Sequence, residues 1–301
     1  MPADAVDVRD YGARGDGTVD DRPAIQRAID SCVRSGGGTV YLPAGDYWLD
    51  SGVMPTGVNA YVAVVLGSGV RLVGAGRGST VLHSSRKGLN LIGATHASRV
   101  AVEDLTLAGG DQDGVKIEGS TGVLVRNVEA SGLYIGVAQY GCTGVRVMDC
   151  VSHDNEAFGF CFGGQLDFPG GSDLSWKNCD AYANSEGFRV FSKAGSTPMI
   201  TEVTLDDCTS HDNVKSGMLA TSVSRLAVRY GFFVNNPIAG IMVVDTHDSA
   251  IVRAVCKGNH GYGDVFVAPW PTADWWASYG PCSNVEVIPW LFDSGFVVVP
   301  R

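Results

Sequence analysis

Residues 150–163 read Cys-Val-Ser-His-Asp-Asn-Glu-Ala-Phe-Gly-Phe-Cys-Phe-Gly, and this phrase returns along the second half of the chain. A small or polar turn ends in Asn, about four residues follow, and a Gly then opens a run of alternating apolar residues. Two further copies are Cys179–Asn184 with Gly187–Val190, and Cys208–Asn213 with Gly217–Ala220. Such a repeat predicts a solenoid, in which every repeat buries part of its neighbours.

The spacing of the repeat glycines indicates the kind of solenoid. Successive glycines are 22, 23, 28, 30, 23 and 23 residues apart, at Gly114, Gly136, Gly159, Gly187, Gly217, Gly240 and Gly263. A basic period of 22 to 23 residues is typical of one coil of a right-handed parallel β-helix. The predicted fold class is therefore all-β, a single-stranded right-handed parallel β-helix. Columns of like residues should stack along it, among them Asn155, Asn184 and Asn213, and Cys150, Cys179 and Cys208.

The N-terminal segment predicts a helical cap for this solenoid. Asp20 and Asp21 precede a helical pattern, and Gly36-Gly-Gly38 ends it. One face of the helix is apolar and can cover the open end of the first coil; it carries Ala24, Ile25, Ala28, Ile29, Cys32 and Val33. We expect one domain over residues 1–301, with the cap in about 1–38 and the coils in about 39–290.

Composition excludes several classes of protein. The 301 residues include 22 Lys+Arg and 32 Asp+Glu, a net charge of −10, so a nucleic-acid partner is not expected. Apolar runs are strand-sized, which predicts no membrane span. The eight cysteines form no Cys-x-x-Cys pair, and no charged-then-apolar leader precedes the repeats. These features predict a reduced, cytoplasmic protein, a monomer or dimer, without a metal or other cofactor.

The opening Val6-Asp-Val-Arg-Asp-Tyr-Gly-Ala-Arg-Gly-Asp-Gly-Thr-Val-Asp-Asp21 and the later Gly36-Gly-Gly-Thr-Val-Tyr-Leu-Pro-Ala-Gly-Asp46 resemble the N-terminal signature of the pectate-lyase-like β-helix superfamily. Within it the chain is most similar to the catalytic module of mannuronan C5-epimerases. That resemblance implies a Tyr-Gly-Phe-Asp-Pro-His segment and a further Asp on the next coil. The matching stretch here is Ile135-Gly-Val-Ala-Gln-Tyr140, and the further Asp falls near Gly163. The epimerase catalytic residues are thus absent by this alignment.

Strand alternation predicts which side chains face outward after each glycine. Positions +1 and +3 should be internal, and positions +2 and +4 should form an outer column. That column contains Lys116, Glu118, Ala138, Tyr140, Cys161, Gly163, Arg189, Phe191, Leu219, Thr221, Met242 and Val244. Strict alternation would also bury Asp264. The column is mostly apolar, unlike the wet, acidic groove expected for a calcium-dependent uronate lyase.

Three longer loops are expected at one edge of this face, because each follows the same strand of its coil. They span 165–171, 193–199 and 271–280. Phe168, Met199, Trp275 and Trp276 could close a cleft over the column, which would then bind a hydrophobic small molecule. The alternative is that the loops face solvent and the tryptophans pack on the last coil.

The predicted catalytic residues are the polar members near these loops: Tyr140, Arg189, Lys193, Lys116 and Glu118. The predicted binding residues are Ala138, Cys161, Phe191, Leu219, Thr221, Met242, Phe168, Trp275 and Trp276. Lys116 and Glu118 could instead form a surface ion pair. Asp111 and Asp113 resemble a metal-binding turn but lack further acidic partners. His247 is a weaker acid–base candidate, and no Ser-His-Asp constellation stands out.

Three functions follow from this pattern. The first is a cofactor-independent cyclase or isomerase of a polyketide-like molecule, working by hydrogen bonding and by holding a reactive conformer, as in an intramolecular [4+2] closure. The second is a polysaccharide lyase or uronate C5-epimerase with displaced catalytic residues. The third is a non-catalytic glycan-binding β-helix.

Overall fold

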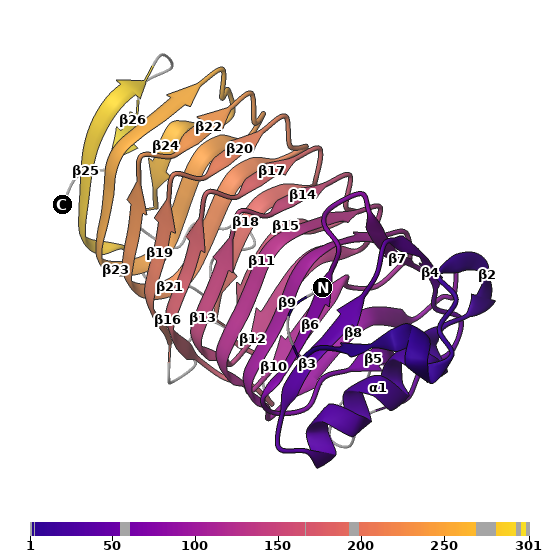
Figure 1. The fold of residues 1–301 in the computed structure, drawn as a ribbon. Coiled ribbons are helices and arrows are strands. Elements are labelled where there is room, and N and C mark those ends of the chain that lie inside the picture. The colour runs from indigo at the N-terminus through magenta and orange to yellow at the C-terminus, as the bar shows by residue number, and fades with distance from the viewer. Residues whose placement is uncertain are drawn as a thin grey trace.

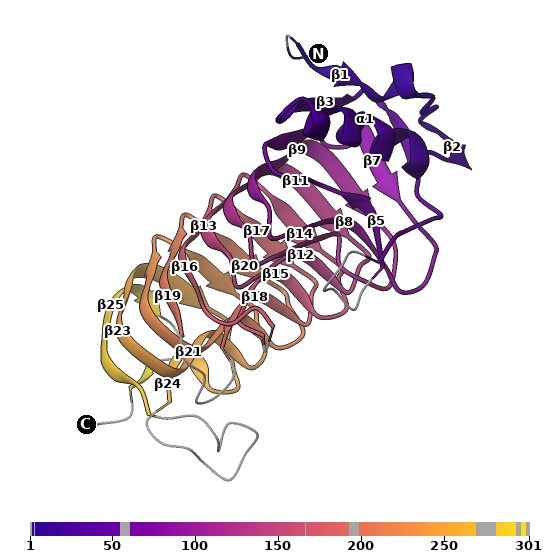
Figure 2. The ribbon, with the colours of Figure 1, turned by 90° about the horizontal axis from the view of Figure 1, so that it is seen from below.

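The computed structural model describes residues 2, 4–54, 61–165, 167–192, 199–268, 281–292 and 296–298. They form the predicted parallel β-helix, in which each strand pairs with its equivalent on the next coil. Figure 1 shows the helix α1 (Arg22–Arg34) at the N-terminal end of the stack, with the last strands at the opposite end. Figure 2 shows the same order of coils from a second side.

The coils have three faces, and the first carries the predicted outer column. Its strands pair in parallel from coil to coil. They are β5 (Tyr61–Val65), β8 (Leu89–Thr95), β10 (Val115–Glu118), β12 (Ile135–Tyr140), β15 (Phe158–Gly163), β18 (Glu186–Phe191), the first parts of β21 (Ser216–Arg229) and β23 (Ala239–Lys257), β24 (Gly263–Val267) and β26 (Phe296–Val298).

The second and third faces continue round the corners of each coil. The longest strands turn these corners: β21 runs from the first face to the second, and β23 runs across all three. The second contains β1 (Val6–Asp7), β3 (Gly38–Leu42), β6 (Val70–Gly74), β9 (Ser98–Ala108), β11 (Thr121–Ser131), β13 (Thr143–Met148), β16 (Gly171–Lys177), β19 (Ile200–Asp206) and β25 (Ser283–Phe292). The third contains β2 (Asp16–Asp20), β4 (Gly45–Trp48), β7 (Thr80–His83), β14 (Val151–His153), β17 (Asp180–Tyr182), β20 (Thr209–His211) and β22 (Phe232–Val234).

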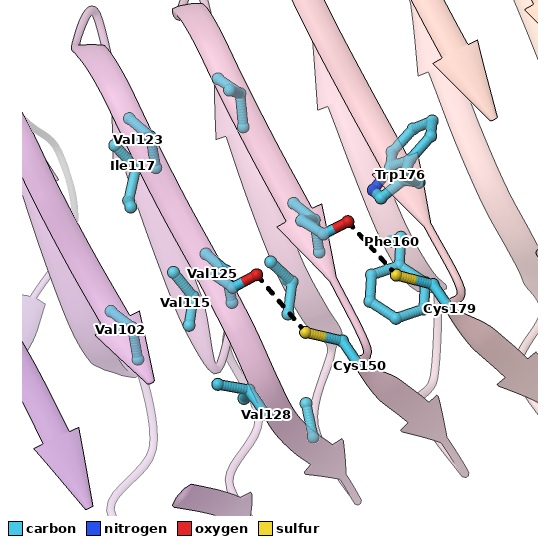
Figure 3. Close-up of a cluster of buried hydrophobic side chains, with 14 of the residues drawn as sticks. Val102, Val115, Ile117, Val123, Val125, Val128, Cys150, Phe160, Trp176 and Cys179 are labelled. Carbon is cyan, nitrogen blue, oxygen red and sulfur yellow. Dashed lines mark hydrogen bonds between the residues drawn. The ribbon is translucent and has the colours of Figure 1, made fainter. Parts of the chain in front are cut away.

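The interior is a continuous apolar column. Leucine, valine and isoleucine fill most of its length, and stacked aromatic rings join them between β15 and β18. The rings of Phe162 and Trp176 lie 3.8 Å apart between centroids and nearly parallel. In the close-up of Figure 3, the thiols of Cys150 and Cys179 donate to the carbonyl oxygens of Val125 and Val147, at 3.6 and 3.5 Å. All eight cysteines carry free thiols.

The Asn ladder predicted from the repeat is confirmed. Asn184 accepts from the backbone N–H and the side-chain amide of Asn155, at 3.1 and 2.9 Å. It donates in turn to Asn213, and the ladder continues through Asn236 and Asn259. These side chains are buried, so each amide satisfies backbone groups that water does not reach. The last amide donates to Asp264, which is fully buried as strict alternation required.

The N-terminal cap is present, with one correction. α1 is preceded by Asp21, whose carboxylate accepts from the backbone N–H groups of Arg14 and Gly15 rather than from the helix. Its predicted apolar face is buried from Ala24 to Cys32. Val33 was expected to be buried on that face, but it is 43% exposed although its side chain lies against Gly67, because it comes one residue before the helix end. α1 has 13 residues, and no helix in the described ranges could span a membrane.

We predict that Asn184→Ala lowers the free energy of unfolding by about 2–5 kcal/mol, because it leaves several buried donors and acceptors of the ladder without partners. The control is Asn178→Gly. Asn178 donates to Asp149 at an exposed corner and has φ 50°, which glycine tolerates. Urea unfolding should show less than about 1 kcal/mol for the control. Equal losses in the two variants would contradict a structural role for the buried ladder.

Candidate functional site

The predicted outward phase of the first face is confirmed by the pairing of its strands. Lys116, Ala138, Cys161, Arg189, Leu219 and Met242 lie in one register column. Glu118, Tyr140, Gly163, Phe191, Thr221 and Val244 form the next. The residues between these columns belong to the interior core, whereas the outward residues form separate clusters.

Most of the outward column is covered. One apolar cluster contains Ala138, Tyr140, Cys161 and Phe168, and a second contains Leu219, Met242 and Val244. Tyr140 is 4% exposed and Met242 1%. The outward column is therefore mostly apolar, as the sequence predicted, but other side chains cover it at these positions.

Part of that cover is the loop predicted to close the site. A Cβ atom on Gly119 or Gly141 would lie only 3.0 or 2.8 Å from an atom of Phe168. Phe168 can therefore pack against these two positions because both are glycine. The ring of Phe168 also lies 5.4 Å from that of His96. Closure by Phe168 is thus confirmed as packing. The predicted residues Lys193, Trp275 and Trp276 lie outside the described residues.

A first charged cluster surrounds Lys116 at the N-terminal end of this face. Its Nζ lies 3.9 Å from Asp113 Oδ2 and 3.9 Å from Glu118 Oε1. It also lies 5.5 Å from the centre of the Tyr140 ring. Lys116 and Glu118 thus form the ion pair that was the alternative, but it is mostly buried, with side chains 18% and 6% exposed.

Burial controls the protonation of this cluster. It raises the pKa of Asp113 to about 7, against the opposing attraction of Lys116. The pKa of Glu118 is raised by the same cause. Asp113 therefore changes charge near neutral pH, beside an ammonium group.

A second charged cluster surrounds Arg189, three coils further on. Arg189 Nη1 lies 3.4 Å from Glu186 Oε2, and the guanidinium lies 5.8 and 5.6 Å from the rings of Phe158 and Phe191. Burial raises the pKa of Glu186, while Arg189 and Lys215 oppose the rise. Within the described part of the chain, Arg189 Nε and the nearby Thr221 Oγ1 are buried without hydrogen-bond partners. A ligand can pair with either group only when the side chains that cover it move aside.

The two clusters are copies of one arrangement. Asp113 and Glu186 each precede a repeat glycine by one residue, and a cation follows each acid three residues later. Three coil spacings separate the clusters by about 14 Å. Sequence reasoning considered Asp113 only as part of a metal-binding turn and missed Glu186, although an acid directly before a repeat glycine was a visible signal. It also missed Lys215.

Tyr140 and Cys161 lie between the clusters. Burial raises the pKa of both groups far above their ordinary values, and a hydrogen bond joins them. The phenol and the thiol are consequently protonated at neutral pH. Tyr140 is therefore neither a base nor an effective acid, and its hydroxyl can only form hydrogen bonds.

The remaining candidates lie elsewhere. Asp111 is exposed and accepts from the backbone N–H of Gly88, and no group of three or more metal-ligating residues occurs among the described residues. His247 lies at the corner after the outer column. Its Nε2 is 3.1 Å from Asp245 Oδ1 and its Nδ1 is 2.7 Å from Ser283 Oγ. The sequence did not predict this series of hydrogen bonds. Ser222 also donates to Asp245, so these hydrogen bonds link the same corner of successive coils.

Comparison with known proteins places this geometry in a family. The model of the right-handed β-helix region matches residues 87–256, and that of rhamnogalacturonase A/epimerase, pectate lyase-like, matches residues 5–97. The mannuronan C5-epimerase AlgE3 of Azotobacter vinelandii is 37% identical over 180 residues, 52% of this chain and 10% of that protein. Alginate lyase 7 of the same organism is 33% identical over 193 residues, 57% of this chain and 22% of that protein.

The structural comparison agrees with the sequence comparison. The A-module of the A. vinelandii mannuronan C5-epimerase AlgE4 superposes with a TM-score of 0.71 and 25% identity, over 94% of this chain and 87% of that module. The present chain spans about a tenth and a fifth of the two curated relatives above, so it matches one module of larger proteins. The chain belongs to the right-handed parallel β-helix family of pectate-lyase-like proteins, and the mannuronan C5-epimerase modules are among its relatives.

Proposed function

We propose that this protein is a carbohydrate-active enzyme of the lyase or epimerase type. It would act on a uronic-acid polysaccharide bound along the outer face of β10, β12, β15 and β18. The observation that carries the proposal is the pair of acid–cation clusters on this face, 113–118 and 186–189, in a fold shared with an epimerase module over 94% of the chain.

Both reactions begin with removal of the proton on C5, next to the sugar carboxylate. In an epimerase, a proton returns to C5 from the opposite face of the ring. In a lyase, the C4–O4 bond breaks, a double bond forms between C4 and C5, and the departing O4 takes up a proton. Both routes build negative charge on the carboxylate, which a nearby cation stabilises.

The described residues divide between these tasks. Arg189, whose Nε has no partner, would bind a sugar carboxylate. Lys116 has the most exposed side chain of its cluster, at 18%, and its ammonium would stabilise the negative charge that builds on the sugar carboxylate. Asp113 would hold that ammonium in place, and Glu118, whose pKa is raised by burial, would take up the C5 proton as a carboxylate. These assignments replace the missing epimerase segment, whose positions hold Ile135, Ala138 and Tyr140.

The direct test is incubation of the protein with polymannuronate, polyguluronate and polygalacturonate in D₂O. Unsaturated chain ends, followed by ultraviolet absorbance, would identify a lyase. Deuterium at C5, followed by NMR, would identify an epimerase. Binding without either product would favour a non-catalytic glycan-binding protein and contradict the proposal.

A second candidate is ring closure of a hydrophobic, polyketide-like small molecule. The apolar cluster of Ala138, Tyr140, Cys161 and Phe168 favours it, because such a surface suits an apolar substrate. None of the three relatives reported above is named for ring closure, so this function takes second place. Accelerated cyclisation of linear polyene precursors, with no effect on the three polyuronates, would reverse the order.

We predict that Arg189→Gln lowers kcat/KM on the active polyuronate by about 10²- to 10³-fold, the usual effect of removing one group that stabilises developing charge. The matched control is Arg225→Gln. Arg225 pairs with Glu202 at 3.2 Å, but both side chains are more than half exposed and lie on the second face. Arg225→Gln should keep the wild-type melting temperature, whereas Arg189→Gln leaves buried Glu186 without its nearest cation and should lower it, so turnover is compared at a temperature where both variants are folded. Near-normal turnover by Arg189→Gln would remove Arg189 from the proposed site.

A second prediction concerns pH and stability. The Asp113 carboxyl has an ordinary pKa of 3.8, which the fold raises to about 7. Between these values the folded protein holds a proton that the unfolded chain has lost, so Asp113 reduces stability as the pH rises through this window. Asp113→Asn removes this loss of stability. The melting temperature of the variant minus that of the wild type should therefore increase from pH 4 to about pH 7.

The control for this pH series is Asp111→Asn, two residues away and exposed. Its melting temperature should follow the wild-type pH dependence. Parallel curves for Asp113→Asn and wild type would mean that burial does not raise the pKa of Asp113.

A further inference from the structure

A cavity of about 240 Å³ lies beyond Arg189, at the start of the strands on the same face. Leu219, Ile238 and Met242 form its apolar wall, and Glu186, Lys215 and Tyr262 form its polar rim. Leu219 and Met242 are almost completely buried, whereas Lys215 and Tyr262 are exposed. The cavity therefore has an apolar interior and opens to solvent beside a cation.

Its size limits what it can hold. A water molecule occupies about 30 Å³ of liquid, and pockets for drug-sized ligands have about 300–1,000 Å³. The cavity is too small for an oligosaccharide and suits one sugar residue or a substituent attached to it.

Its chemistry selects among substituents. A free sugar hydroxyl facing Leu219, Ile238 and Met242 would lose its hydrogen bonds to water without gaining a partner. A methyl group there gains from burial. At the rim, Lys215 and Arg189 both act on Glu186, so a second carboxylate entering here meets two cations and one acid.

We propose that this cavity binds the acyl group of an O-acetylated uronate residue, with the ester methyl against Leu219, Ile238 and Met242 and the sugar carboxylate near Lys215. This inference rests on the proposed function and specifies its substrate class: a uronate polymer that carries acetyl esters. An O-acetyl ester adds a methyl group and leaves the carboxylate free for the cations.

The test compares two forms of one polymer. Polymannuronate is chemically O-acetylated, half of the batch is deacetylated in mild alkali, and the binding of each form to the full chain is measured by isothermal titration calorimetry. The wild-type protein should bind the acetylated form about three to ten times more tightly, because one methyl group and part of an ester leave water. Equal affinities would overturn the proposal.

Two variants separate the wall from the rim. Ile238→Phe fills part of the cavity from a partly exposed position, and should abolish the preference while leaving the affinity for the deacetylated form unchanged. Lys215→Gln should weaken binding of both forms by the same factor and leave the preference intact. The control for bulk is Val214→Phe, which adds a ring at a position that is 69% exposed and should change neither affinity.

These results also separate this inference from the proposed function. Suppose that the deacetylated polymer is bound and converted. If the wild type then shows no preference for the acetylated form, or if Ile238→Phe keeps that preference, only the proposed acetyl site is wrong. If neither form is bound, the proposed function fails and the acetyl site fails with it.

Discussion

Parallel pairing in constant register between coils is the constraint on which the rest of this structure depends. Each residue lies above its counterpart on the previous coil. Residues that share a position in the repeat therefore form a column along the molecule. The buried amides of Asn155, Asn184 and Asn213 hold the turns in that register, because each satisfies the one before it. A slip of one residue would break the ladder and turn the apolar column outward.

The candidate site follows from the same constraint. Asp113 and Glu186 share a column, as do Lys116 and Arg189, so the two acid–cation pairs are placed on one straight line about 14 Å apart. Between them the column is apolar and covered, and this lowers the local dielectric constant around the charges. That explains why the pKa values of Asp113, Glu118 and Glu186 all rise and why burial is the largest cause in each case. A substrate carboxylate at such a site meets cations that water screens only weakly.

Much of the fold could be predicted from the sequence, because period and alternation are local signals. The strand phase was right from Lys116 to Met242 and even required the burial of Asp264, which ends the Asn ladder. Val33 was expected to be buried and is 43% exposed, because it lies in the last turn of the helix at the edge of the cap.

The site was harder to predict. Tyr140 was expected in a cleft and is buried, because its cover comes from Phe168, on a loop whose path the repeat does not specify. The acids Asp113 and Glu186 precede the repeat glycine, where the alternation argument does not extend. The contact of His247 with Ser283 joins residues 36 apart across coils, so no local pattern announces it.

The central claim is that Lys116 and Arg189 mark the ends of a binding face for a uronate polymer. A crystal structure of the protein soaked with a uronate oligosaccharide tests it most directly. The account predicts electron density for the sugar along β10, β12, β15 and β18, with one carboxylate within hydrogen-bonding distance of Arg189. Sugar bound on the second or third face, with this face empty, would contradict it.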